Sequence, residues 1–417
     1  MKVLVIGGGG REHTLVWKIA LSPKVSEVYC APGNPGMKNL ATIVNISVDD
    51  INVLADFAEK NKIDLTVVGP EAPLVSGIVD EFEKRGLKIF GPSKAAAQIE
   101  GSKVFSKNLM KKYNIPTAKY QVFEKPQDAI DYIHSVNMPQ VIKAEGLAAG
   151  KGVVIAQDRD TAEAAVKSIM IDKTFGNSGN RIVIEEYLQG PEVTVLAFCD
   201  GKVAVPMVSS RDHKRVCDGD KGPNTGGMGA VSPAPAYSVE LDQVVKESII
   251  QKTVDAMAKE GMPFKGVLYT GLMLTQEGPK VLEYNCRFGD PEAQVVIPRL
   301  KTDLVDIMLA ILNGNLADVQ IEWRQEAAVC VVMASGGYPG HYETGKVITG
   351  LEDAEKTGAI VFHAGTTVKN NKIVTAGGRV LGITALGKDV QTARQKAYEA
   401  VSKIHFDGMH YRKDISK

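Results

Sequence analysis

The feature that most constrains the fold of this chain is a regular alternation of short apolar runs and amphipathic stretches over its first hundred residues. Runs rich in β-branched residues lie at 3–6, 25–30, 65–68 and 87–90, and stretches with helical spacing of apolar residues separate them. This rhythm is typical of β–α–β units, which build a parallel sheet with helices on both faces. We therefore predict an α/β domain over residues 1–102.

Loops rich in glycine and proline follow the predicted strands, and ligands of parallel sheets bind beyond the carboxyl ends of the strands. The first loop, GGGGREH, joins a strand to a helix, so its N–H groups favour an anion such as phosphate. A tight turn accounts for one or two of the four glycines but not readily for all. Glu12 stands where a dinucleotide-binding GxGxxG motif has its third glycine, and the second strand ends without an acid, which argues against NAD.

Two further domains are predicted, over residues 103–326 and 327–417. The middle region combines a lysine-rich helix at 103–112 with several strands and a long polar loop at 209–233, and loops of that length are usually functional. The last region is smaller and rich in strands. Its motif GGRVLGIT brings Arg379 either to the wall of an active site or to a glycine-rich hairpin corner.

The composition excludes several classes of protein. Lys+Arg and Asp+Glu both number 49, which argues against a nucleic-acid-coating chain, so any anion site must be local. The five cysteines form no CxxC pair and fit reduced thiols. No apolar run approaches the roughly 20 residues that span a bilayer, and the start lacks a signal-peptide core. We expect a cytoplasmic protein without nucleic-acid or membrane partners, and a monomer or weak homo-oligomer.

Three segments of the middle region together indicate a nucleotide site. Lys143 ends an apolar strand, where a lone lysine is usually solvated, but the loop EGLAAGKG follows it, and such a loop can fold its N–H groups over a triphosphate. It is not a Walker A motif. The segment IEEYLQGPE at 184–192 offers backbone groups to adenine and Glu192 to ribose hydroxyls; by itself, a pair of solvated edge acids is the simpler interpretation.

The third segment, LEYNCRFGDPE at 282–292, places Glu283, Asn285 and Arg287 on one face of a strand. Burying these groups unpaired in a core would cost several kcal/mol. As hard oxygen ligands and a guanidinium, they suit a Mg²⁺ site that bridges ATP phosphates. The neighbouring strand, at 266–274, contains no Asp or Glu, so Glu283 would have to bridge two ions if two were bound.

The order of these segments resembles the ATP-grasp superfamily. The motifs GGGGREH, APGNPG, GPEAPLVSG, GPSKAAAQIEGSK, SSRDHKR, NTGGMGA and LEYNCRFGDPE closely resemble the phosphoribosylamine–glycine ligases, also called glycinamide ribonucleotide synthetases. The resemblance covers the first two regions and, more weakly, the third. It implies an α/β and α+β protein with an N-terminal parallel domain (pre-ATP-grasp), a two-part ATP-grasp core and a small strand-rich C-terminal domain.

The resemblance also implies an activity. These ligases join glycine to 5-phosphoribosylamine with ATP, through a glycyl phosphate, and give glycinamide ribonucleotide, ADP and phosphate in de novo purine biosynthesis. Positioning and charge neutralisation carry such chemistry, so no nucleophilic Ser or Cys is needed. The implied cofactor is Mg²⁺ or Mn²⁺. Alternatives are another ATP-grasp carboxylate–amine ligase, a purine-pathway or biotin-dependent carboxylase, or a non-catalytic nucleotide-binding module.

Roles carry over only to matching positions. Glu283 and Asn285 would bind the metal, and Arg287 and Asp212 would act at the glycine and acyl-phosphate end. The implied ATP contacts are Lys103, Lys143, Gly146, Gly150, Lys151, Gly152, Glu185, Tyr187, Leu188 and Glu192. The implied phosphoribosylamine contacts are Gly9, Gly10, Glu12, Glu71, Asn224, Gly226 and Gly227. His13 and His213 lie in family-like motifs and could touch substrate, whereas the other histidines lack metal-ligand spacing.

Overall fold

The first hundred residues form a five-stranded parallel sheet in the order β3-β2-β1-β4-β5. The computed structural model describes residues 1–148 and 152–417. The strands are β1 (Lys2–Gly7), β2 (Glu27–Pro32), β3 (Thr42–Ile43), β4 (Leu65–Val68) and β5 (Ile89–Phe90). The connecting helices are α1 (Gly10–Ala20), α2 (Ile51–Lys60), α3 (Glu71–Ser76), α4 (Ile78–Lys84) and α5 (Lys94–Gly101). The predicted parallel α/β domain is thus confirmed. Strand β3 was not predicted, because its two residues are too few to show an alternating pattern.

The middle of the chain forms two antiparallel four-stranded sheets. The larger, β11-β10-β16-β17, contains β10 (Glu192–Asp200), β11 (Ala204–Pro206), β16 (Lys265–Thr275) and β17 (Gly278–Asn285). The smaller, β6-β9-β7-β8, contains β6 (Tyr120–Phe123), β7 (Gln140–Ala144), β8 (Val153–Ala156) and β9 (Ile182–Glu186). These two sheets are the two parts that the resemblance to ATP-grasp enzymes implies.

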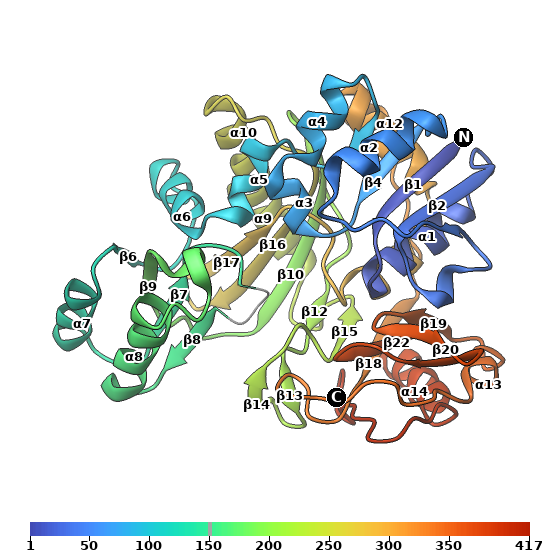
Figure 1. The fold of residues 1–417 in the computed structure, drawn as a ribbon. Coiled ribbons are helices and arrows are strands. Elements are labelled where there is room, and N and C mark those ends of the chain that lie inside the picture. The colour runs from blue at the N-terminus through green and yellow to red at the C-terminus, as the bar shows by residue number, and fades with distance from the viewer. Residues whose placement is uncertain (149–151) are drawn as a thin grey trace.

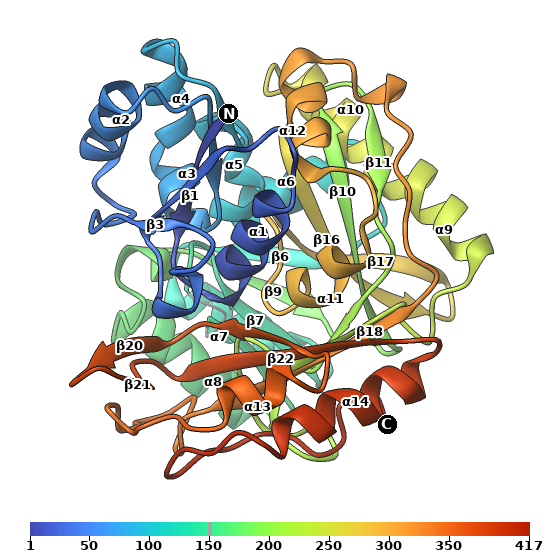
Figure 2. The same cartoon turned by 90° about the vertical axis from the view of Figure 1, so that its right-hand side faces the viewer.

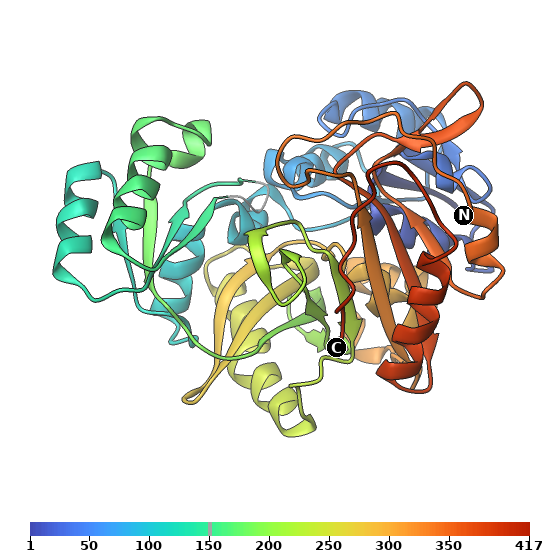
Figure 3. The same cartoon turned by 90° about the horizontal axis from the view of Figure 1, so that it is seen from below.

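The smaller sheet and its helices α7 (Pro126–Ser135) and α8 (Arg159–Val166) form a lobe that stands apart from the rest of the molecule (Figures 1 and 3). This small lobe has a hydrophobic core of its own, which includes Ile142 and Ile184. The larger sheet instead shares its core with the N-terminal domain. Helix α6 (Lys103–Lys112) leads from the N-terminal domain to the small lobe.

The C-terminal region forms a sheet in the order β12-β15-β18-β22-β19. Its own strands are β18 (Ala327–Ala334), β19 (Ile360–His363) and β22 (Arg379–Gly387). Helices α13 (Leu351–Glu355) and α14 (Val390–Val401) lie on one side of this sheet (Figure 2). Two of its strands come from the middle of the chain, β12 (Arg211–Asp212) and β15 (Gly229–Ser232). The C-terminal sheet is therefore continuous with the segment at 211–232.

That segment corrects one expectation. Residues 209–233 were expected to form a long loop, but they contain β12, β13 (Arg215–Cys217), β14 (Lys221–Asn224) and β15. All four strands are short, β12 to β14 are largely polar, and the buried strand β15 pairs with β18, a hundred residues further on, so local sequence gives no strand pattern. β13 and β14 form an isolated two-stranded hairpin. Within the described ranges, no helix is long and apolar enough to cross a membrane.

Candidate active site

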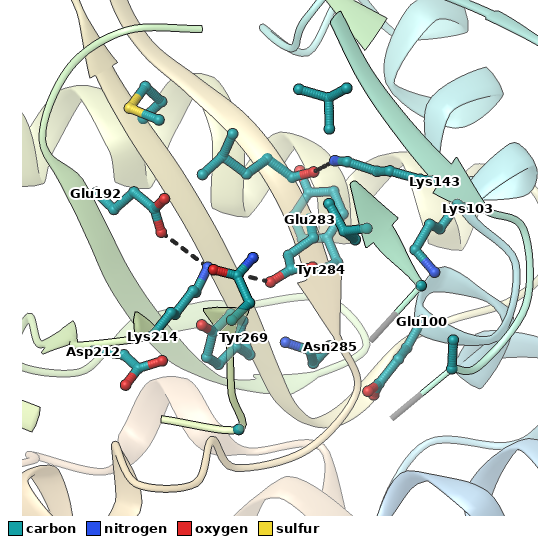
Figure 4. Close-up of a pocket in the computed structure, with 18 of the residues that line it drawn as sticks. Glu100, Lys103, Lys143, Glu192, Asp212, Lys214, Tyr269, Glu283, Tyr284 and Asn285 are labelled. Carbon is teal, nitrogen blue, oxygen red and sulfur yellow. Dashed lines mark hydrogen bonds and ion pairs between the residues drawn. The ribbon is translucent and has the colours of Figure 1, made fainter. Parts of the chain in front are cut away.

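A cavity of about 680 Å³ opens where the small lobe, the larger sheet, the N-terminal domain and the segment at 211–226 meet. Charged side chains from all of these elements face it (Figure 4). Most of the residues predicted for ATP, metal and glycine line this one cavity. They are Lys103, Lys143, Gly152, Glu185, Tyr187, Leu188, Glu192, Asp212, Glu283, Asn285 and Arg287. The structure thus brings Lys103 and Arg287, which lie 184 residues apart in the chain, into one cavity.

The small-lobe side of the cavity holds one carboxylate between two lysines. In β7, Lys143 Nζ lies 3.0 Å from Glu185 Oε1 and also donates to the carbonyl of Leu282 at 3.0 Å. In α6, Lys107 Nζ lies 3.0 Å from Glu185 Oε2. All three charged side chains are buried. Glu185 is therefore not a solvated edge acid, and its charge is compensated from both sides.

Lys107 is a cavity residue that sequence reasoning missed. It lies one helical turn beyond Lys103 in the lysine-rich helix, and spacing of four places both on the same face. Burial lowers the pKa of Lys107 to about 8, although Glu185 raises it in part. Burial also lowers the pKa of Lys103, whose Nζ donates to the carbonyl of Gly146 at 3.0 Å. The cavity thus holds ammonium groups that an incoming anion would stabilise.

Only part of the predicted glycine loop lies within the described residues. Gly152 lines the cavity, whereas Gly146 reaches it only through its carbonyl contact with Lys103. Gly150 and Lys151 lie outside the described residues. Their assignment to ATP binding remains a prediction.

The predicted metal ligands, Glu283 and Asn285, lie on β17 and face the cavity (Figure 4). Burial raises the pKa of Glu283, but the positive charges of Lys214, Lys143 and Lys103 lower it by a larger amount. The pKa therefore lies below its usual value, and the carboxylate is ionised. Across the described part of the chain, no cluster of three or more His, Cys, Asp or Glu side chains has metal-site geometry. One carboxylate and one amide nevertheless fit Mg²⁺, which keeps several waters and takes further oxygens from substrate phosphates.

Lys214 is a second cavity residue that the sequence did not reveal. Its Nζ lies 2.9 Å from Glu192 Oε2 and 3.7 Å from Glu283 Oε1, so it links the predicted ribose and metal ligands. Burial lowers its pKa, but Glu192 and Glu283 raise it well above the usual value. The available signal was its place two residues after Asp212 in SSRDHKR, because alternate residues of an extended chain share a face.

Asp212 lies in β12 with its Oδ1 buried and without a hydrogen-bond partner among the described residues. Burial and the neighbouring carboxylate of Glu292 raise its pKa well above the usual value. Glu292, also unpredicted, accepts from the hydroxyl of Tyr269 in β16 at 2.9 Å. A buried carboxyl oxygen without a partner is costly, so a hydrogen-bond donor from a bound substrate would satisfy it.

Arg287 joins the N-terminal domain to β17. Its Nε donates to Glu71 Oε2 at 3.1 Å and its Nη2 donates to Glu100 Oε1 at 3.0 Å. Burial lowers the pKa of Arg287, but Glu100 and Glu71 raise it by a larger amount, so the pKa lies above its usual value. The guanidinium is thus already paired with two carboxylates of the N-terminal domain. Glu100 was not predicted, although it lies in the GPSKAAAQIEGSK motif.

The first glycine loop differs from expectation at Glu12. Its Oε2 accepts from the N–H of Gly9 at 2.6 Å and its Oε1 from Arg11 Nε at 2.5 Å, and it does not line the cavity. A Cβ added at Gly7 or Gly69 would meet Glu12 at 2.4 or 2.1 Å. These two glycines make room for a buried capping side chain, so the glycine run is explained in part by packing. Gly9 and Gly10 also lie outside the cavity wall, whereas Glu71 and Arg11 line it.

The NTGGMGA loop reaches the cavity through Asn224 and Gly226. Gly227 has φ +109°, and a Cβ there would lie 2.6 Å from Asp212 Oδ1, so this glycine lets the loop approach Asp212. Arg379 donates to the carbonyls of Gly226 and Asp290, the latter at 2.9 Å, and lines the cavity. Of the two interpretations of Arg379, the structure supports the active-site wall.

The two histidines in family-like motifs lie elsewhere. His13 Nδ1 accepts from the N–H of His363 at 2.8 Å, and His213 Nε2 accepts from the N–H of Ser416 at 3.2 Å. Neither lines the cavity. Burial lowers the pKa of His13 to about 3 and of His213 to about 4. Both rings are therefore neutral contacts between parts of the chain.

The sheets and the lysine-lined cavity define an ATP-grasp protein, and the comparisons with known proteins give the family. Sequence profiles of phosphoribosylglycinamide synthetase match the N domain at residues 1–100, the ATP-grasp (A) domain at 101–293 and the C domain at 328–417. The chain belongs to this family.

Relatives of known name agree with this assignment. Phosphoribosylamine–glycine ligases of Caldanaerobacter subterraneus and of Escherichia coli K12 are both 52% identical, over 100% of this chain and 99% and 98% of theirs. A crystal structure of the Thermotoga maritima ligase has TM-score 0.86 and 36% identity, and each chain is fully covered. A Hydrogenobacter thermophilus biotin carboxylase domain, with TM-score 0.74, 14% identity and 98% and 91% coverage, shares the fold alone.

Proposed function

We propose that this chain joins glycine to 5-phosphoribosylamine at the expense of ATP, through a glycyl phosphate, and releases glycinamide ribonucleotide, ADP and phosphate. The single observation that carries the proposal is the cavity itself. Lys103 and Lys143 face Glu283 and Asn285 across one space, which is what a metal–triphosphate requires. Family membership supports the same activity, whose place is de novo purine biosynthesis.

The nucleotide occupies the space between the small lobe and β17 in this proposal. Lys103 and Lys143 neutralise its phosphates, and the segment with Tyr187 and Leu188 meets the adenine. Lys214 holds Glu192 in place beside the ribose. Gly152 lies beside the phosphates, and Gly146, Gly150 and Lys151 stay predicted phosphate contacts. Glu283 and Asn285 hold Mg²⁺ or Mn²⁺, which when bound supplies positive charge to the phosphate oxygens.

Glycine lies at the end of the cavity that holds Asp212 and Arg287. The carboxylate of glycine attacks the γ-phosphorus, and the bond to the bridging oxygen of ADP breaks. Arg287, fixed by Glu71 and Glu100, offers positive charge without having to move. Asp212 accepts from the amino group of glycine. The ribosyl amine then attacks the acyl carbon, and phosphate leaves with one of the former carboxylate oxygens.

Phosphoribosylamine enters from the N-terminal domain. Glu71 and Arg11 on one side, and Asn224 and Gly226 on the other, line that end of the cavity. Gly9, Gly10 and Gly227 are backbone neighbours of this substrate, whereas Glu12 acts by shaping the first glycine loop. No nucleic acid or membrane takes part, and a monomer or weak homo-oligomer in the cytoplasm remains our prediction.

ADP release across a panel of amino acids tests the proposed function. With MgATP and phosphoribosylamine present, glycine is expected to support turnover at least tenfold faster than alanine, because the proposed glycine end of the cavity is lined by the charged side chains of Asp212 and Arg287, which offer no apolar contact to a methyl group. ADP release should stop when phosphoribosylamine is omitted. Equal rates with alanine, or no ADP release with glycine, would contradict the proposal.

Nucleotide binding should take up protons near pH 8. The pKa of Lys107 is about 8 in the free protein, so at that pH close to half of the protein molecules carry a neutral Lys107. Triphosphate charge favours the ammonium form and raises that pKa, so a proton is taken up on binding and ATP affinity falls as the pH rises above 8. Calorimetry at pH 8 in buffers of different ionisation enthalpy measures the uptake. Identical binding heats in all buffers would show that no proton is taken up and that Lys107 is already charged in the free protein.

A further inference from the structure

The C-terminal tail of the chain holds the β13–β14 hairpin. Arg412 has a side chain only 2% exposed, and it forms a two-point pair with Asp414, from Nε at 2.8 Å and from Nη2 at 2.9 Å. Its Nη1 donates to Asp220 Oδ1 at 2.7 Å and to the carbonyl of Arg215 at 3.1 Å. One buried guanidinium therefore ties the tail to a strand and to the turn of the hairpin.

Further contacts fix the same turn. The N–H of Gly219 donates to Asp414 Oδ2 at 2.7 Å, and the N–H of Lys413 donates to Asp218 Oδ1 at 2.8 Å. His410 Nε2 lies 2.8 Å from the carbonyl oxygen of Val216. The hairpin forms a two-stranded sheet by itself, and an isolated two-stranded hairpin is marginally stable. The contacts with the tail supply stabilisation that neighbouring strands would give in a larger sheet.

The hairpin is part of the cavity wall. Arg215, Asp220 and Asn224 line the cavity, and Lys214, which holds Glu192 and approaches Glu283, directly precedes β13. Asp220 Oδ2 also lies 3.6 Å from Arg211 Nη2, another lining residue. A shift of the hairpin would therefore move groups at the metal, ribose and substrate ends together.

We propose that Arg412, with Asp414, is a positioning residue for the reaction. Arg412 does not itself line the cavity and acts through the lining residues Arg215 and Asp220, so the C-terminal tail contributes to catalysis at a distance. The inference rests on the proposed function. A displacement of about 1 Å in reacting groups can cost a hundredfold in rate, so loosening the hairpin is expected to lower kcat. The KM for ATP should change less, because Lys107 and Lys143 pair with Glu185 and not with the hairpin. Among the predicted ATP contacts in the described chain, Glu192 is the one that Lys214 links to the hairpin.

Two conservative variants and one control test this inference. Arg412→Lys cannot reach both carboxylates, and Asp414→Asn removes the paired charge while keeping the shape. Arg394→Lys is the control, since Arg394 donates to the tail carbonyls of Ile415 and Lys413 but forms no hydrogen bond with the hairpin in the described part of the chain. We expect kcat to fall at least tenfold in both test variants, with KM for ATP within threefold, and the control to match the parent.

A second readout is independent of activity. Cys217 in β13 is exposed, whereas the other four cysteines are buried, so a thiol-reactive fluorophore reports on the hairpin. Measured without substrates, its anisotropy is expected to fall in both test variants and not in the control. Parental kcat in the folded variants, or a lost kcat with unchanged anisotropy, would overturn the inference. If Arg412→Lys does not fold, Asp414→Asn decides. A parent without glycine-dependent ADP release would instead refute the proposed function, and the anisotropy would still report on the hairpin.

Discussion

Glu283→Gln is expected to reduce turnover by a factor on the order of 10³, because a bound metal ion contributes several kcal/mol of charge stabilisation and its one carboxylate ligand would be lost. The amide keeps the size of the side chain. Metal-free ATP should still bind, since Lys103 and Lys143 remain in place. Steady-state ADP release at saturating Mg²⁺, together with calorimetry of ATP in EDTA, measures the two effects separately.

The matched control is Glu277→Gln, in the turn between β16 and β17. Glu277 is 77% exposed and pairs only with Lys280 in the described structure. An exposed ion pair is worth about 0–1 kcal/mol, so this variant should keep parental turnover. Turnover in Glu283→Gln within threefold of the parent would remove Glu283 from the metal site.

Arg287→Ala is expected to lower both stability and activity. The substitution leaves Glu71 and Glu100 without their shared cation, and removing one partner of a buried ion pair costs about 3–5 kcal/mol. We therefore expect the free energy of unfolding, measured in urea, to fall by that amount. Turnover should fall at least 100-fold, because the glycine end of the cavity loses its positive charge.

A charge-matched double variant tests whether the stability loss of Arg287→Ala comes from unpaired carboxylates or from lost packing. If unpaired charge is responsible, Arg287→Ala combined with Glu100→Gln should recover about half of the lost stability but none of the turnover. Arg85→Ala is the control, since Arg85 makes surface ion pairs with Asp56 and Glu81, and it should cost much less stability than Arg287→Ala. Equal losses from Arg85→Ala and Arg287→Ala would contradict this account of the Arg287 contacts.

The local sequence patterns predicted the fold where strands are long and apolar. The parallel domain, the β16–β17 pair and the strand-rich last region carry clear periodicity, so they were visible. Residues 209–233 were expected to form a loop because β12 to β14 are short and largely polar, and because β15, though buried, is short and pairs with the distant strand β18. Long-range pairing cannot be read from local alternation.

The candidate site was predictable where one motif holds several chemical groups on one face. Glu283, Asn285 and Arg287 were found in this way. Lys107, Lys214 and Glu292 were missed because their surroundings are built by other segments, and their charge alone is typical of solvated residues. Glu12 shows the opposite case, since this charged residue of a phosphate-like loop is a buried cap in the structure. Partners that are distant in sequence decide such cases, and the folded structure supplies them.

Transfer of ¹⁸O from glycine to phosphate tests the central claim, ligation through a glycyl phosphate, most directly. The protein is incubated with MgATP, phosphoribosylamine and glycine labelled in both carboxylate oxygens, and the released phosphate is examined by mass spectrometry. The mechanism predicts one ¹⁸O atom in each phosphate and one in the amide of the product. Product formation with unlabelled phosphate would contradict it.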